Sequence, residues 1–119
     1  MLCMRRALAS AAMAVAFAMI GCGSDLPEID CGAEPTIPTY AEVDIFTATC
    51  NGCHASTVTG AARFSAPANV NFDTYPAAQS AAEQAVEQVY GGAMPPSGFT
   101  ATEEQKHELY VWGLCGTPP

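Results

Sequence analysis

Apolar residues recur at helical spacing in three stretches of the chain, and segments rich in glycine, proline and small polar residues separate them. Each stretch opens with a polar pair three residues apart that is typical of a helix start. These pairs are Thr39 and Glu42, Ser80 and Glu83, and Thr100 and Glu103. The stretches run over 39–50, from 76 or 80 to 90, and from 100 to about 114. This pattern predicts an all-α domain with three main helices.

The first residues have the pattern of an export signal that ends in a lipid-attachment site. Arg5 and Arg6 precede an apolar run over 7–20, which is shorter than the about 20 apolar residues that a membrane span needs. The run ends in Gly21 and Cys22, which resembles the lipobox of bacterial lipoproteins. We expect lipidation of Cys22. The alternative is ordinary signal cleavage near the same place, which would leave Cys22 as a free thiol.

Residues 22–38 are rich in proline and acidic residues, a composition that favours an extended spacer over packed structure. The predicted organisation is a lipoprotein signal peptide at 1–21, a flexible membrane tether at 22–38 and one domain at 39–119. We therefore expect a membrane-anchored lipoprotein on the periplasmic side of the bacterial cell envelope.

Acidic residues dominate the charge of the chain. The 12 aspartates and glutamates outnumber the four lysines and arginines, so the formal net charge is −8, and it becomes −10 when Arg5 and Arg6 leave with the leader. This charge excludes nucleic acid as a partner, because the phosphates would be repelled. It would steer a redox partner with a basic docking surface toward the protein, or serve only to keep the protein soluble.

Cys50, Cys53 and His54 form a CxxCH motif at the end of the first predicted helix. Side chains three apart on a helical turn lie on one face, so each thiol can form a thioether with one of the two vinyl groups of a porphyrin. His54 then lies under the iron as the proximal ligand. The motif therefore predicts one covalent haem c.

Two other interpretations of the CxxC pair have less support in the sequence. A redox dithiol would follow a strand in a βαβ pattern, and no such pattern precedes Cys50. A zinc site would need further ligands, and outside the motif the exported chain offers only His107, Cys31 and Cys115, none of them in a second paired spacing.

Met94 is the only methionine outside the predicted leader, and it follows CxxCH by about 40 residues in a loop with glycines and two prolines. Such a loop can hold a thioether in place, so we expect Met94 to be the second axial ligand. The alternative for Met94 is a side chain that fills a gap in the core. His107, which lies among glutamates in the last predicted helix, is the runner-up ligand.

The second predicted helix carries small apolar residues on one face. They are Ala78, Ala82, Ala85, Val86 and Val89. Their size indicates close packing against a flat group such as the haem, although ordinary core packing would have the same pattern.

Cys31 and Cys115 are the two cysteines left without a role. An exported protein meets an oxidising compartment, so we expect them to form a disulfide. Closing so long a loop would contribute roughly 4 kcal/mol in the chain-entropy model, and it would join the N-terminal segment to the last helix.

Residues 55–71 show no regular period and predict a loop around the haem edge. We expect the guanidinium of Arg63 to be solvated, with an ion pair to a haem propionate as the alternative. Phe72 and Tyr75 are expected in the pocket wall or the core, and the Tyr75 hydroxyl could bond a propionate. We expect Trp112 to pack on the first helix or the haem edge.

These features resemble the class I cytochromes c, in their single-haem, lipid-anchored bacterial form. The resemblance covers about residues 40–114, and it rests on Phe46 four residues before the motif, on CxxCH itself, on the Met94 loop and on a closing helix with Trp112. It implies a fold whose first and last helices cross steeply around one haem, with His54 and Met94 as axial ligands. Members often have glycine at the helix crossing, where this chain has Glu42.

A haem iron with both axial positions filled has no site for a substrate, so we expect a carrier of one electron between envelope redox partners and not an enzyme. Two other functions stay open. A labile Met94 would make the protein a small-ligand sensor or a weak peroxidase. Without haem, the disulfide-closed domain would be a binding or structural module.

Overall fold

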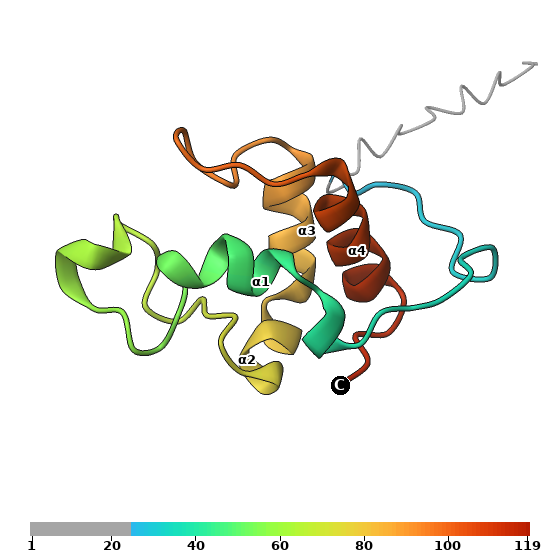
Figure 1. Ribbon diagram of the computed structural model, residues 1–119, viewed down its shortest axis with the longest axis horizontal. Helices are drawn as coiled ribbons and strands as arrows, with labels where there is room; N and C mark the ends of the chain where they lie inside the picture. The colour runs from blue at the N-terminus through green and yellow to red at the C-terminus, as the bar shows by residue number, and fades with distance from the viewer. Residues whose placement is uncertain (1–24) are drawn as a thin grey trace, which may run out of the picture.

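The computed structural model describes residues 25–119, so the predicted signal peptide and the lipidation site at Cys22 lie outside the described residues. The described part is all-α and contains no strand, as predicted. The helices are α1 (Ile45–Ala48), α2 (Tyr75–Ser80), α3 (Ala82–Tyr90) and α4 (Glu103–Leu114) (Figure 1). Short 3-10 turns cover Tyr40–Glu42, Cys50–Gly52 and Gly60–Arg63. None of the helices in this part has the length and apolarity needed to cross a membrane.

The first predicted helix, over 39–50, is not continuous. The capping box exists, since the backbone N–H and the hydroxyl of Thr39 donate to Oε2 of Glu42 at 2.8 and 2.9 Å, but it caps only a 3-10 turn. The α-helical part is limited to the four residues of α1. Low helix propensity is common in this stretch, because four β-branched residues alternate along it: Val43, Ile45, Thr47 and Thr49. Burial of Val43, Ile45 and Phe46 therefore decides the path of the backbone.

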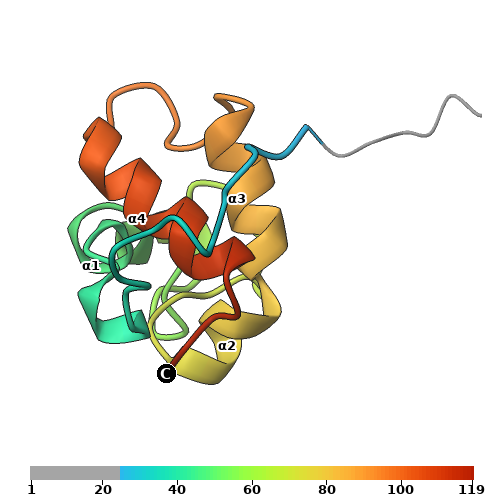
Figure 2. The ribbon, with the colours of Figure 1, turned by 90° about the vertical axis from the view of Figure 1, so that its right-hand side faces the viewer.

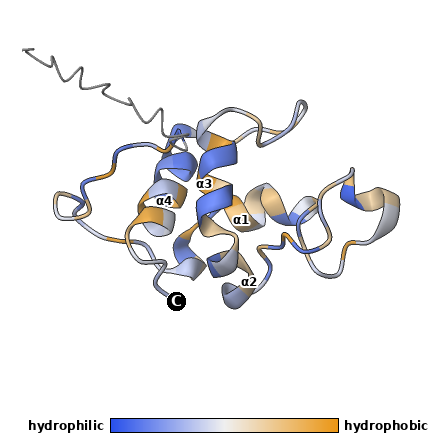
Figure 3. Ribbon diagram, turned by 180° about the vertical axis from the view of Figure 1, so that it is seen from behind, coloured by the Kyte–Doolittle hydropathy of each residue, from blue (hydrophilic) through white to orange (hydrophobic). Residues whose placement is uncertain are grey.

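The second predicted helix is divided into α2 and α3 at Ala81, which has φ −101° and ψ 4°. Ser80 does not cap α3, because its hydroxyl donates to the carbonyl of Pro76 at 2.9 Å. The apolar face is as predicted: its five alanines and valines are all buried. Hydrophilic and hydrophobic residues are mixed along α3, as expected for a helix with one buried face (Figure 3).

The last helix begins two residues later than its predicted cap. Thr102 is the N-cap of α4, where its hydroxyl accepts a bond from the Gln105 N–H at 3.1 Å and Gln105 Oε1 accepts one from the Thr102 N–H at 2.9 Å. The sequence holds two overlapping capping patterns. The second is used because Gln105 also donates to Asp44 Oδ2 at 2.9 Å, which ties the start of α4 to the start of α1.

The core forms where α3 and α4 pack together, with α1 against α4. Trp112 of α4 is fully buried and meets Phe46 of α1 edge to face, with ring centroids 5.3 Å apart. Its indole N–H donates to the carbonyl of Pro118 at 2.8 Å. The prediction that Trp112 packs on the first helix is therefore confirmed.

A disulfide joins Cys31 to Cys115, with Cα atoms 5.6 Å apart, which confirms the predicted pairing. Glu34 Oε2 lies 3.2 Å from Nε2 of His107 in α4, and Leu26 packs against the core. The N-terminal segment passes across α4 (Figure 2). Residues 31–38, which the sequence assigns to a tether, are thus fastened to the domain.

Candidate functional site

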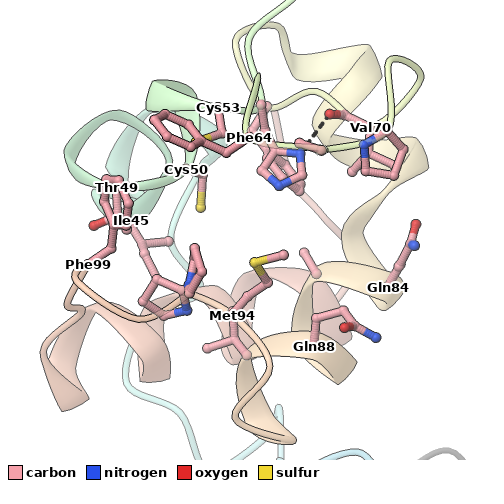
Figure 4. Close-up of a pocket in the computed structure, with 18 of the residues that line it drawn as sticks. Ile45, Thr49, Cys50, Cys53, Phe64, Val70, Gln84, Gln88, Met94 and Phe99 are labelled. Carbon is pink, nitrogen blue, oxygen red and sulfur yellow. Dashed lines mark hydrogen bonds between the residues drawn. The ribbon is translucent and has the colours of Figure 1, made fainter. Parts of the chain in front are cut away.

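A cavity of about 260 Å³ lies between α1, α3, the loop over 60–72 and the loop over 94–99 (Figure 4). Its walls are mainly apolar, with Ile45, Phe72, Ala85, Val89 and Leu109 among the buried residues that line it. All four residues predicted to hold a cofactor border this one cavity. They are Cys50, Cys53, His54 and Met94.

Cys50 and Cys53 lie on either side of a tight turn and are not disulfide-bonded. The sulfur of Cys50 points into the cavity (Figure 4). Burial raises the pKa of the Cys50 thiol to about 12. A redox dithiol relies on a lowered thiol pKa, so this environment argues against that alternative and leaves Cys50 as a protonated thiol in an apolar pocket.

The imidazole of His54 has a fixed orientation. Its Nδ1 lies 2.9 Å from the carbonyl oxygen of Val70, the bond drawn as a dashed line in Figure 4. A carbonyl only accepts hydrogen bonds, so Nδ1 carries the proton and Nε2 has the free lone pair of the neutral ring. Phe72 packs edge to face on the imidazole, with centroids 5.4 Å apart, and its N–H donates to the His54 carbonyl at 2.8 Å. A histidine held in this way has the tautomer that metal-ligating histidines use.

Met94 follows the C-terminal end of α3 in a loop that is bonded back to that helix. The N–H groups of Ala93 and Met94 both donate to the carbonyl of Gln88, each at 3.0 Å. The thioether sulfur of Met94 points into the cavity from the wall facing Cys50 (Figure 4). The loop thus presents the one thioether of the described residues to the same space as the CxxCH motif.

Arg63 is not solvated, so that expectation is wrong. Its side chain is only 6% exposed, and every nitrogen of the guanidinium group donates to the surrounding loop. The acceptors are the carbonyl oxygens of Ala55, Val58, Ala66, Pro67 and Val70 and the Oδ1 of Asn71, at 2.6 to 3.2 Å. An irregular loop leaves many carbonyls without helical partners, and the five N–H groups of one arginine satisfy them.

Several other residues lie away from the cavity. His107 is exposed on α4, pairs with Glu34 and does not line the cavity, so the runner-up ligand is not at the site. The Tyr75 hydroxyl donates to the Thr117 carbonyl at 3.0 Å. Phe72, in contrast, is in the cavity wall and stacks on Phe46 with centroids 5.1 Å apart.

A zinc site of the usual kind finds no support in the described part of the chain. Among residues 25–119, no group of three or more histidine, cysteine, aspartate or glutamate side chains is arranged to hold a metal ion. The thiols and the imidazole of CxxCH therefore border a cavity and do not converge on one point.

Comparison of the chain with protein-family models, with characterised proteins and with solved structures yields no match in any of the three.

Proposed function

We propose that the cavity holds one covalent haem c and that the protein carries single electrons between redox partners of the cell envelope, as the class I cytochromes c do. One observation carries the proposal. The CxxCH motif and the single thioether of the described residues, far apart in the sequence, border the same apolar cavity.

The residues present fit such a group. The thiols of Cys50 and Cys53 would form its two thioether bonds, Nε2 of His54 would bind the iron on one side, and the Met94 sulfur would bind it on the other. The apolar wall suits the porphyrin faces, and the raised pKa of the Cys50 thiol reflects its burial in that wall. With these ligands the haem would supply reversible one-electron exchange.

Two axial ligands from the chain leave no coordination position for a substrate, which favours an electron carrier over an enzyme. The cations of the described residues contribute little to the surface. Arg63 is buried, and Lys106 is bonded to Glu103 at 2.7 Å. The 12 acidic residues therefore give the surface a strong negative charge, which favours a redox partner with a basic docking surface.

The membrane location is also part of the proposal. It is supported by the export pattern of the leader and by the small residue Gly21, which precedes Cys22. Cys22 would carry the lipid. Two or more acyl chains are needed for stable anchoring, and lipoprotein processing supplies them.

The test is the optical spectrum of the protein produced with cytochrome maturation, oxidised and reduced, beside Met94→Ala and His107→Ala. We expect a low-spin spectrum with a weak far-red sulfur-to-iron band that Met94→Ala abolishes and His107→Ala leaves intact. A high-spin wild-type spectrum, or one that Met94→Ala does not change, would contradict the proposed ligation. A spectral change of the reduced wild-type protein on adding carbon monoxide would then favour ligand sensing.

A further inference from the structure

Arg63 and His54 donate hydrogen bonds to the same carbonyl oxygen. Nη2 of Arg63 lies 3.2 Å from the Val70 oxygen, and Nδ1 of His54 lies 2.9 Å from it. A carbonyl oxygen has two lone pairs, so it accepts both donors at once. The guanidinium and the imidazole are therefore linked through the Val70 carbonyl, and both side chains line the cavity.

The guanidinium of Arg63 is also a buried positive charge without a carboxylate partner in the described part of the chain. The ion pairs found there involve Lys106 and His107. Arg63 does act on Asp73, whose pKa is lowered chiefly by the hydrogen bond from Ser56 and least by the charge of Arg63. A charge held by carbonyl dipoles alone keeps a strong field in a low-dielectric interior.

We propose that Arg63 is a positioning residue that also raises the reduction potential of the group bound in the cavity. It fixes the carbonyl that orients His54, and it holds a positive charge against the cavity wall. This inference rests on the proposed function, because it requires His54 to be an axial ligand.

The two roles have separate physical causes. Nη2 of the guanidinium lies within hydrogen-bond distance of Pro67 O, Asn71 Oδ1 and Val70 O, so its two N–H groups share these three acceptors. This contact fixes the carbonyl that accepts from His54. The charge acts on the equilibrium between the oxidised and the reduced state. A haem bound there would take up one electron from a reduced partner, which would lower the charge in the cavity by one unit, and a fixed positive charge would favour that state.

The expected size follows from Coulomb's law. A unit charge that acts on the bound group over about 10 Å, through an effective dielectric constant of about 20, changes the equilibrium constant for its reduction about tenfold. Loss of the charge should therefore lower the ratio of reduced to oxidised protein about tenfold at a fixed ambient potential. For a one-electron couple this is about 59 mV.

The experiment compares three variants of the haem-loaded protein with the wild type. Arg63→Met removes the charge and all donors. Arg63→Lys keeps the charge but loses the planar fork. Lys106→Met is the matched control, because Lys106 is the other cation of residues 25–119 and does not line the cavity. The measurements are the midpoint potential and, by NMR of the reduced protein, the exchange rate of the His54 Nδ1–H with solvent.

We expect Arg63→Met to lower the potential and to speed the exchange, Arg63→Lys to speed the exchange with little change in potential, and Lys106→Met to change neither. A potential shift in Arg63→Met no larger than that in Lys106→Met would overturn the electrostatic role. Unchanged exchange in Arg63→Lys would overturn the positioning role, and this holds even when Arg63→Met fails to take up haem. Failure of the proposed function would show earlier, in a wild-type spectrum without histidine-ligated haem.

Discussion

Gly113 of α4 lies directly against Val86 of α3. A Cβ atom at residue 113 would stand 2.6 Å from Cγ2 of Val86, closer than packed side chains allow. Gly113 is inside α4 and does not end it, and the glycine that ends it is Gly116, with φ 101°. A close approach of two helices in the described residues thus lies between α3 and α4.

Gly113→Ala should destabilise the protein by about 1–3 kcal/mol, because the added methyl group forces α3 and α4 apart. Denaturant unfolding of the wild type, Gly113→Ala, Val86→Ala and the double variant would measure this. In the double variant the methyl group enters the space that Val86 leaves, so the two changes should cost less together than the sum of each alone. Simple additivity would show that the two side chains do not compete for this space.

The double variant Cys31→Ser/Cys115→Ser should lose about 2–5 kcal/mol of unfolding free energy, because the disulfide closes a loop with a sequence separation of 84. The spectrum of the proposed haem should not change, since neither sulfur lines the cavity. Thermal unfolding with and without reductant is the measurement. Reductant should destabilise the wild type and leave the variant unaffected, and equal sensitivity of both would count against the bond.

Ser56 and Asp73 should make stability depend on pH in acid. The hydroxyl of Ser56 donates to Asp73 Oδ2 at 2.5 Å, and this bond is the main reason why the pKa of Asp73 is lowered. A lowered folded-state pKa contributes stability above the unfolded value, about 3.9, and this contribution is lost as pH falls through the folded value.

Ser56→Ala should therefore be less stable than the wild type near neutral pH, with the difference shrinking in acid. Stability measured from pH 7 to pH 2 would show this trend. Thr57→Ala, an exposed neighbouring change, serves as the control and should follow the wild-type curve. A deficit in Ser56→Ala that stays constant over this pH range would exclude linkage to Asp73.

Thr102→Ala should cost about 1 kcal/mol, because it removes the side-chain acceptor for the Gln105 N–H at the start of α4. Thr100→Ala is the matched control and should cost much less, since the bond at residue 100 uses the backbone carbonyl, which accepts from the Thr49 hydroxyl at 3.1 Å. Chemical denaturation of both variants measures the free energy of unfolding and shows which of the two threonines caps α4. The opposite order would place the helix start at the cap predicted from sequence.

The sequence alone selects the four candidate cofactor-binding residues, whereas it predicts the helix boundaries poorly. Cys50, Cys53 and His54 lie within one short motif, and Met94 is the one methionine outside the predicted leader, so no tertiary information is needed to select them. The structure places them around one cavity. The helix breaks at Val43 and Ala81 depend on which side chains are buried, and that is decided by contacts between distant parts of the chain.

Arg63 shows why part of the site could not be predicted. Its acceptors are mainly backbone carbonyls. Every residue has such a carbonyl, so no pattern of side chains in the sequence predicts which ones Arg63 binds. The one signal in the sequence is that Arg63, the single arginine of residues 25–119, stands in a stretch of small residues, prolines and glycine without a helical period. The same holds for Val70, whose role at the site depends on its carbonyl and not on its side chain.

The bond between Cys31 and Cys115 also limits how far the domain can travel from the proposed anchor. Cys31 follows Cys22 by nine positions, and a fully extended chain of that length spans about 30 Å. A tether that ran freely to residue 39 would span almost twice that distance. If Cys22 carries the proposed lipid, the disulfide would hold the domain close to the bilayer surface, where it would collide more often with partners embedded in the same membrane than with proteins diffusing at a distance.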